Sequence, residues 1–411
     1  MLTNVGQDQT PPEMLSSETT FAQILSQAGY RTGYAGKWHV GVRKGPRDWG
    51  FTDVEPESRR QYISRFSESI ELDDKQAGGP VHGNRFLLSA RRSGAVAQDD
   101  TGYCETQGLA LLDAFAKQGS PFFLRIDFSA PHPTYVIPEP FASAIDPGEI
   151  RLDPSVTEET FARKPYIHEE QTRRWGTRSL PEETWRRVIA RYHGMVSMMD
   201  GAVGRILERL RALGLEDNTL VIFTTDHGDA TGSHCMYDKG YCAYEEQYRI
   251  PLIVRGPGVP RGGECREWIS SLDLAPTIVE AAGLKMPAEL EIDGKSLLPA
   301  LREGAPLGRD SIFGEFHGMQ YGLCSIRWAR DERFKYVLNG NDRPELYDTI
   351  ADPFELRNLA GTGEAADEEK RMYSVLMRWM QATRDPMLKT IWGRAAYDPS
   401  FDPGDEAYWF V

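Results

Sequence analysis

The sequence has no excess of positive charge and no long apolar run, and each absence excludes a class of protein. Its 411 residues contain 47 Lys and Arg against 61 Asp and Glu, which gives a net charge of −14. An acidic chain has no general field that would attract nucleic-acid phosphates, so we expect no nucleic-acid partner. No segment approaches the roughly 18–20 consecutive apolar residues of a membrane span, so we expect no membrane partner.

Paired cysteine motifs and a secretion signal are also missing. The five cysteines are scattered, and no two of them form a CxxC pair. We therefore expect neither a disulfide framework nor a zinc knuckle, and a reducing compartment is the default. The opening residues, MLTNVGQDQTPPEM, lack the basic and apolar regions of a signal peptide. A cytoplasmic location is the default expectation, and the sequence does not indicate an oligomeric state.

Helix-like and strand-like patterns alternate over most of the chain. Amphipathic patterns near 21–28, 101–118 and 182–214 predict helices, and apolar runs at 122–128, 220–225 and 250–256 predict strands. Continuous apolar runs are typical of strands buried on both faces. The alternation predicts an α/β core, with a mostly parallel sheet and helices on both faces. Residues 42–103 and 138–182 are polar and weakly patterned, and we interpret them as loops.

The pattern changes at about residue 309. Short alternating segments, such as GLCSIRWARDERFKYVLNG, predict antiparallel strands, and EEKRMYSVLMRWMQA predicts a final helix. A chain of this length can hold a large core and an appendage. We therefore divide it into an α/β core at 1–308, a small C-terminal α+β subdomain at 309–385 and a tail at 386–411.

Polar groups follow the predicted strands. Lys37 and His39 lie in GYAGKWHVG, His132 in APHPTY and Asp226 in TTDHGDATG, with Lys239 further along the same segment. Taken singly, each has an ordinary explanation as a helix cap, a rigid turn or a solvated lysine. Ligands bind beyond the carboxyl ends of strands in open α/β sheets, so we expect these five residues to converge on one pocket.

This set of side chains suits the cleavage of an ester at a tetrahedral oxyanion. Lysines would neutralise oxygen atoms as negative charge develops on them. One histidine would protonate the leaving alcohol, and another would position or deprotonate a nucleophile. A carboxylate would hold a hard divalent cation that polarises the ester.

The same segments, in order, resemble the sulfatase family of the alkaline phosphatase superfamily. GYRTGYAGKWHVG, APHPTY, TTDHGDATGSHCMYDKG, YRIPLIVRGPG and ELYDTIADPFELRNLA are similar to its successive signatures, and the resemblance covers about residues 19–385. It implies an alkaline-phosphatase-like fold. It also implies a sulfuric ester hydrolase whose partner is a small anionic ester substrate.

The resemblance also implies roles for individual residues. Lys37 and Lys239 would bind the sulfate oxygens. His39 would contact the hydroxyl of the family's formylglycine nucleophile, and His132 would lie beside the leaving-group oxygen. His317, in GEFHGMQYG, would line the substrate pocket.

A divalent metal is implied as well. Asp226 and His227 would be its ligands, with Ca²⁺ as the expected ion. His227 and His234 are softer ligands than the asparagine often found in the family, and they leave Mn²⁺ or Zn²⁺ open.

One departure from the family pattern concerns the nucleophile. The family's Cys/Ser-x-Pro-x-Arg motif, whose first residue becomes formylglycine, does not occur, and none of the five cysteines begins it. The paired metal aspartates that precede this motif also have no counterpart. We therefore expect a core that is incomplete at its N-terminal side, a gap in its sheet and no turnover by the chain as written.

Two other functions stay open. The first is a phosphodiester or phosphonate ester hydrolase of the same superfamily, with Mn²⁺ or Zn²⁺ as its metal. The second is a non-catalytic protein that keeps an anion pocket. The alcohol part of the substrate is not readable, because the pocket walls fall in the weakly patterned segments.

Overall fold

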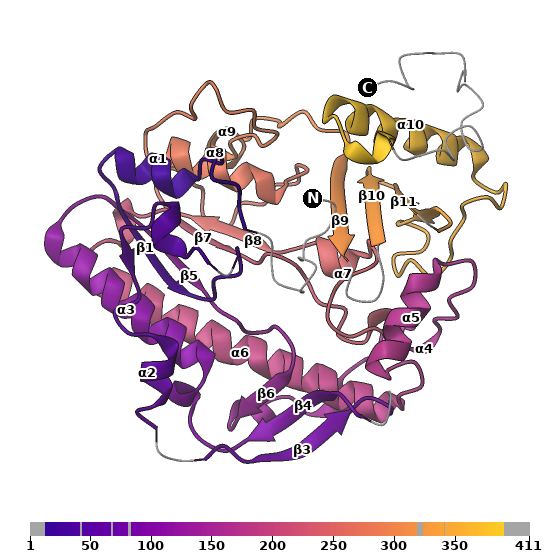
Figure 1. Ribbon diagram of the computed structural model, residues 1–411, viewed down its shortest axis with the longest axis horizontal. Coiled ribbons are helices and arrows are strands. Elements are labelled where there is room, and N and C mark those ends of the chain that lie inside the picture. Colours follow the sequence, from indigo (N-terminus) through magenta and orange to yellow (C-terminus); the bar gives the residue numbers. More distant parts are fainter. Residues whose placement is uncertain are drawn as a thin grey trace.

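The computed structural model describes residues 13–41, 43–66, 69–80, 84–318, 324–340 and 342–389. Figure 1 shows a group of strands and long helices on one side, and an antiparallel sheet with its helix on the other. The predicted fold class, α/β with a C-terminal antiparallel part, is confirmed. Most of the predicted tail at 386–411 lies outside the described residues.

A three-stranded parallel sheet leads to the predicted site. β1 (Arg31–Gly36) lies between β2 (Asp53–Val54) and β5 (Phe122–Asp127) and runs parallel to both. On one face, the Phe115 ring of α3 (Asp100–Gln118) fills the space that Gly33 leaves open. On the other, Phe21 of α1 (Phe21–Gln27) packs on Phe123, with ring centroids 5.3 Å apart. Helices therefore cover both faces, as the alternating pattern predicts.

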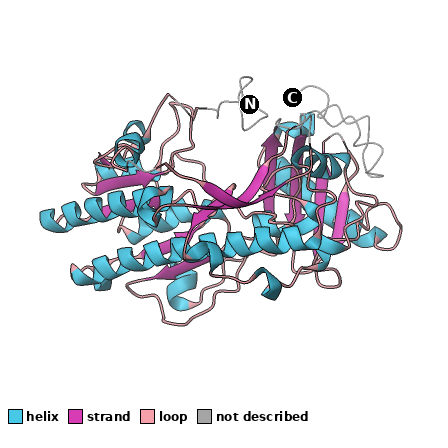
Figure 2. Cartoon of the chain, turned by 90° about the horizontal axis from the view of Figure 1, so that it is seen from below, coloured by secondary structure: helices cyan, strands magenta, loops and turns pink. Residues whose placement is uncertain are grey.

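Two long helices run side by side across the molecule (Figures 1 and 2). α6 (Glu182–Ala212) packs along α3. Ion pairs join the two helices, Arg205 to Glu105 at 2.5 Å and Arg209 to Asp113 at 2.7 Å. Another face of α6 carries apolar residues to a second sheet: Trp185, Val188, Met195 and Met198.

The second sheet corrects the interpretation of 42–103 as loops. β4 (Leu87–Arg92) pairs antiparallel with β3 (Leu72–Ala77) and parallel with β6 (Tyr135–Pro138), and α2 (Arg59–Ile63) lies in the same segment. β3 reads LDDKQA and leaves Asp73, Asp74 and Lys75 exposed. A strand held by its neighbour rather than by its own apolar face has no alternation for sequence analysis to detect.

The second predicted loop, at 138–182, contains two helices, α4 (Pro154–Thr157) and α5 (Tyr166–Trp175). α5 buries polar side chains, His168, Gln171 and Thr172, where an apolar stripe would normally lie. Its helical periodicity is therefore invisible on an apolar scale, and the loop interpretation was wrong.

β7 (Val221–Thr224) and β8 (Leu252–Arg255) form a separate antiparallel pair. Both strands were predicted, but their expected burial on both faces is wrong, because β7 is half-buried and Ile253 is 63% exposed. Among the described residues neither strand pairs with β5. An apolar run marks a strand but fixes neither its direction nor its neighbours. Nearby helices are α7 (Glu245–Tyr248), α8 (Leu274–Ala281) and α9 (Leu298–Glu303).

The C-terminal part has the predicted antiparallel strands and final helix. Its four-stranded sheet has the order β12-β11-β10-β9. The strands are β9 (Ile312–Gly318), β10 (Cys324–Arg330), β11 (Phe334–Asn339) and β12 (Glu345–Asp348). α10 (Ala366–Ala382) covers the sheet with a methionine-rich face, in which Met372, Leu376 and Met380 are fully buried.

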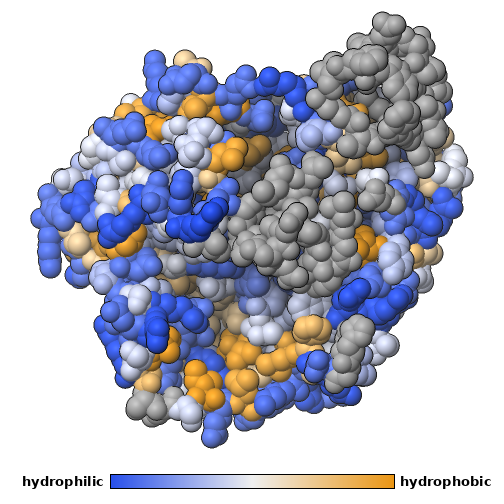
Figure 3. Space-filling model, viewed as in Figure 1, coloured by the Kyte–Doolittle hydropathy of each residue, from blue (hydrophilic) through white to orange (hydrophobic). Residues whose placement is uncertain are grey.

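The surface is largely hydrophilic in the view of Figure 3, with apolar groups gathered toward the lower edge, where β3, β4 and β6 lie. None of the helices in the described part of the chain has both the length and the apolar character needed to cross a bilayer.

A buried ion pair lies in the C-terminal part. Arg327 of β10 is 0% exposed, and its guanidinium donates to both oxygens of Asp385, with Nη2 to Oδ1 at 3.1 Å. Asp385 also accepts the N–H of Met387 at 2.8 Å. Buried charges are tolerated only when they are paired in this way.

We expect Asp385→Ala to lower the free energy of unfolding by about 3–5 kcal/mol, because Arg327 stays buried while losing its main partner. Urea denaturation followed by circular dichroism measures this loss. The matched control is Glu364→Ala, which breaks an ion pair on the surface. In that pair the Glu364 side chain is 52% exposed and the Arg357 side chain is 65% exposed. Exposed pairs contribute about 0–1 kcal/mol. Equal losses in the two variants would contradict the prediction.

Candidate functional site

The site begins at the carboxyl ends of β1 and β5, where Gly36 pairs with Asp127. Gly36, the last residue of β1, has φ +109°, and a Cβ there would lie 2.1 Å from the carbonyl oxygen of Asp127. Only glycine fits this contact. The N–H of Lys37 donates to the same carbonyl at 2.9 Å. The ends of the two strands are thereby joined, and Lys37 leaves the sheet at a fixed point.

The Asp127 side chain forms hydrogen bonds at the same strand ends, and sequence analysis did not identify it as part of the site. It accepts from the Tyr34 hydroxyl at 2.7 Å and from Nε of Arg125 at 2.9 Å. The available signal was a carboxylate at the end of an apolar strand. That signal indicates a cap or turn as readily as a site.

Lys239 and His132 are in direct contact, although 107 residues separate them. Nδ1 of His132 lies 2.8 Å from the carbonyl oxygen of Pro133. A carbonyl only accepts, so Nδ1 carries the proton and Nε2 the lone pair. Nζ of Lys239 lies 2.6 Å from that Nε2 and donates to it. Burial and the Lys239 charge lower the pKa of His132, which keeps the imidazole neutral.

Lys37 and His39 share the same electrostatic environment. Burial and then Lys239 lower the pKa of Lys37, while Asp226 opposes the shift. Burial, Lys37 and Lys239 lower the pKa of His39. Coulomb interactions weaken with distance, so these mutual effects indicate neighbouring groups. We call the six residues around this point the cationic cluster: Lys37, His39, His132, Asp226, His227 and Lys239.

Asp226 and His227 are the metal-ligand candidates of the cluster. Nδ1 of His227 donates to the Gly228 carbonyl at 2.8 Å, which leaves Nε2 free at 3.7 Å from Oδ2 of Asp226. Burial acts to raise the pKa of Asp226, but His227 and Lys37 hold it below its usual range. The ring centroids of His132 and His227 lie 6.0 Å apart. Because His132 contacts Lys239, this places Asp226 and His227 near that lysine.

The residues present do not fit a calcium site. No group of three or more His, Cys, Asp or Glu side chains placed to hold a metal occurs in the described part of the chain. Ca²⁺ takes six to eight oxygen ligands, and one carboxylate beside one imidazole is far from that set.

His317 is not joined to the cluster. It lies on β9, its Nδ1 is 2.8 Å from the Ser325 hydroxyl, and Glu315 is its nearest carboxylate, at 4.0 Å. Burial and Arg327 lower its pKa. Its role in the substrate pocket stays a prediction that these contacts do not support.

His234 is also outside the cluster, which corrects its consideration as a soft metal ligand. Its Nδ1 donates to Oε2 of Glu159 at 2.5 Å, and its ring stacks on Tyr244 with centroids 3.6 Å apart. Lys164 pairs with the same carboxylate. The side chain is 1% exposed, so it is enclosed rather than open to an ion.

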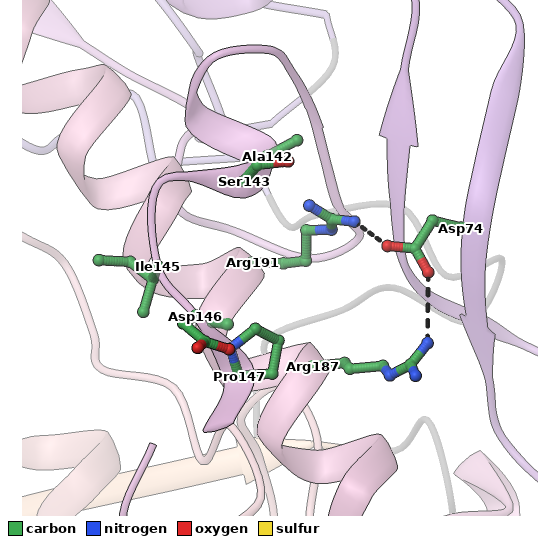
Figure 4. A pocket seen from close by; sticks show the side chains of 9 residues that line it. Asp74, Ala142, Ser143, Ile145, Asp146, Pro147, Arg187 and Arg191 are labelled. Carbon is green, nitrogen blue, oxygen red and sulfur yellow. Dashed lines mark hydrogen bonds and ion pairs between the residues drawn. The ribbon is translucent and has the colours of Figure 1, made fainter. Parts of the chain in front are cut away.

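A cavity of about 290 Å³ lies elsewhere, between β3, the 142–147 segment and α6. Figure 4 shows the Asp74 carboxylate between Arg187 and Arg191 at its edge. Arg187 also pairs with Glu183 at 2.7 Å. None of the lining residues belongs to the cationic cluster. The Asp74 carboxylate of β3 pairs with both arginines of α6, and we interpret these ion pairs as contacts that hold β3 against α6.

Two family models match the chain. The model described as Sulfatase matches residues 1–284. The model described as N-sulphoglucosamine sulphohydrolase, C-terminal, matches residues 232–382. The second match begins inside the predicted core, and the boundary at 308/309 stays a prediction.

Similar proteins include members of the same superfamily. A multifunctional alkaline phosphatase superfamily protein, PehA from Trinickia caryophylli, is 34% identical over 60% of this chain and 52% of its own length. An uncharacterized sulfatase of Escherichia coli, YidJ, is 28% identical over 91% of this chain and 74% of its own. The chain thus spans about half of the length of PehA.

A solved structure shares the fold. The phosphonate monoester hydrolase SpPMH from Silicibacter pomeroyi superimposes with a TM-score of 0.75 at 24% identity, over 94% of this chain and 83% of that one. This likeness extends through both the core and the C-terminal sheet.

The enclosed His234 predicts a pH dependence of stability. Burial is the main cause that lowers its pKa, to about 3, while the pKa of Glu159 falls to about 2 because His234 and Lys164 outweigh its burial. Between pH 6.5 and 4.5 the unfolded chain takes up a proton at His234 that the folded protein does not. Stability is therefore lost as pH falls through this window, by up to about 1.4 kcal/mol per pH unit.

Urea denaturation at stepped pH tests this dependence. We expect the slope to become shallower in His234→Gln and to stay unchanged in His193→Gln, since His193 is exposed on α6. An unchanged slope in His234→Gln would show that another group causes the acid sensitivity.

The incomplete ligand set predicts weak metal binding. Complete calcium sites reach dissociation constants of about 10⁻³ to 10⁻⁹ M, and Asp226 with His227 should not reach even the weak end of that range. Calorimetric titration with Ca²⁺ measures the constant. Micromolar binding that disappears in Asp226→Ala would contradict this expectation.

Proposed function

This chain belongs to the sulfatase family, and we propose that its cationic cluster binds the anionic group of a sulfuric ester. One observation carries the proposal. Lys37 is half-buried, repelled by Lys239, and without an ion-pair partner among the described residues. An anion placed between the two ammonium groups would relieve this repulsion and restore the favourable environment that burial removes.

The side chains of the cluster have complementary parts in this proposal. Lys37 and Lys239 donate to the ester's terminal oxygens, where charge develops as the ester bond breaks. Once Lys239 donates to the anion, Nε2 of His132 is free to face the leaving-group oxygen, and it would protonate that oxygen only after first taking up a proton itself, because Nε2 carries a lone pair in the structure. Partial burial and the two lysines lower the pKa of His39 and so favour its neutral form, which can accept a hydrogen bond from a nucleophile's hydroxyl.

We infer that the 411-residue chain binds the ester without turning it over. The cluster as defined supplies no hydroxyl or thiol nucleophile, and the Cys/Ser-x-Pro-x-Arg motif does not occur in the sequence. Four of the five cysteines are buried. Burial raises the pKa of Cys104 and of Cys324 to about 12, and a thiol reacts only as its thiolate.

The second candidate is a phosphonate monoester or phosphodiester ligand. PehA is named as a multifunctional member of the superfamily, and the solved phosphonate monoester hydrolase shares this fold. Sulfuric monoesters and phosphonate monoesters both carry one negative charge on a tetrahedral centre. The two lysines therefore attract either ligand.

We expect Lys239→Ala to weaken the binding of 4-nitrophenyl sulfate about tenfold or more. The variant loses a charge-assisted hydrogen bond, and such bonds contribute about 1.5–3 kcal/mol. Isothermal titration calorimetry measures the affinity. Lys117→Ala is the matched control, because Lys117 is an exposed lysine of α3. Unchanged affinity in Lys239→Ala and Lys37→Ala would refute the proposed anion site.

The same preparation tests the ligand class and the absence of turnover. Competition with the monophenyl ester of phenylphosphonic acid, which carries one negative charge, ranks the two candidate ligands. Release of 4-nitrophenol should stay at the buffer rate, since losing a nucleophile costs several powers of ten. Release above that rate, abolished by Lys37→Ala, would show that the chain has a nucleophile of its own.

A further inference from the structure

The segment that carries Lys239 is held at its first residue by a buried ion cluster. His234 donates to Glu159, and Lys164 pairs with the same carboxylate. The ammonium of Lys164 also donates to the main-chain carbonyl of Glu355 at 2.8 Å. The Lys164 and Glu159 side chains are both 0% exposed. The start of the segment is thus tied to Glu355, in the turn after β12.

The far end of the segment is tied to the same residue. Nζ of Lys335, on β11, donates to the Ala243 carbonyl at 2.6 Å and lies 3.2 Å from Glu245. Lys335 also pairs with the Glu355 carboxylate. The other oxygen of that carboxylate accepts the N–H of Glu245 at 2.9 Å.

Glu355 itself has a constrained backbone. Its φ is +51°, in the left-handed region that residues other than glycine seldom adopt, and it is 1% exposed. Such a conformation is unfavourable by itself and persists only where its surroundings fix it. Here the surroundings are the two lysines and the Glu245 N–H, and the conformation lets one residue meet both ends of the segment.

Between its ends the segment has little freedom of its own. Met236, Tyr237 and Cys242 are 0% exposed. The N–H of Gly240 donates to the Gln247 side chain at 2.9 Å, and the Lys239 carbonyl accepts from Gln171 at 3.3 Å. A displacement at either end would therefore be transmitted to Lys239 rather than absorbed nearby.

We propose that Glu355 is a positioning residue of the anion site. It acts through Lys164 and Lys335 on the backbone of 234–245, and so sets where the Lys239 ammonium meets His132. The proposal rests on the proposed function for the identity of the ligand, but the placement of Lys239 is measurable without one.

The test is Glu355→Gln, which keeps the side-chain length and an oxygen for the Glu245 N–H but removes the charge that pairs with Lys335. Two quantities are measured on the full chain: the dissociation constant for inorganic sulfate by calorimetry, and the pKa of His132 by NMR of its imidazole. Lys239 is one of the causes that lower this pKa. If Lys239 moves away, the pKa of His132 should rise toward its ordinary value, and sulfate should bind roughly 3- to 30-fold more weakly.

Glu364→Gln is the control, since Glu364 pairs with Arg357 on the surface of the same C-terminal part. It should change neither quantity. A folded Glu355→Gln protein with the wild-type His132 pKa and sulfate affinity would overturn the proposal. If Glu355→Gln does not fold, Lys335→Arg keeps the charge, changes the geometry at Ala243 and is judged by the same two readouts.

The two readouts also separate this proposal from the proposed function. If the wild-type chain binds no sulfate, the anion site is refuted, while the His132 pKa still reports on Lys239. A shifted His132 pKa in Glu355→Gln would then support positioning alone. An unshifted pKa would overturn both.

Discussion

A charge that leaves water must find a partner inside the protein, and this constraint organises the junction between the α/β core and the C-terminal sheet. Lys164, Lys335 and Arg327 have side chains that are 0–1% exposed. Each pairs with a carboxylate that is itself buried: Glu159, Glu355 and Asp385. At the junction proper, Lys164 of the core and Lys335 of the sheet both reach Glu355. Separating the two parts would leave these charges buried and unpaired or would expose them to water, so the parts should fold and unfold together.

In the cationic cluster this pairing is incomplete. Lys37 lies in a half-buried position without a carboxylate partner in the described part of the chain, whereas Lys239 pairs with Asp238 at 3.1 Å and also donates to the His132 imidazole. The fully buried lysines, Lys164 and Lys335, are paired with carboxylates, and an unpaired lysine beside a second lysine has a local field that favours an incoming anion. The overall charge of −14 does not oppose this field at short range, because exposed charges are screened beyond about 8–10 Å.

The sequence was most informative where apolar periodicity and strand ends carry the signal. α3, α6 and the C-terminal strands follow from periodicity. The rule for parallel strand ends applies to β1 and β5, which precede Lys37 and His132, but β7, which precedes Asp226, pairs antiparallel with β8 and among the described residues pairs with neither of them. Lys239 lies well beyond the end of β7, and the sequence connected it to the others only because it lies further along the segment that carries Asp226. Sequence analysis missed β3 and α5 because neither has a clear apolar face: β3 is largely polar and exposed, and α5 buries polar side chains. Glu355 escaped notice because its importance lies in a backbone conformation and in two lysines that are distant in sequence.

The burial of four cysteines has a practical consequence for experiments on this chain. Cys104, Cys235, Cys242 and Cys324 are enclosed, and Cys265 is the exposed one. Enclosed thiols with raised pKa values react slowly with maleimides and iodoacetamides at neutral pH. The native protein therefore offers one chemically addressable thiol. A fluorophore or spin label can be attached there, between β8 and α8, without removing any cysteine by mutagenesis.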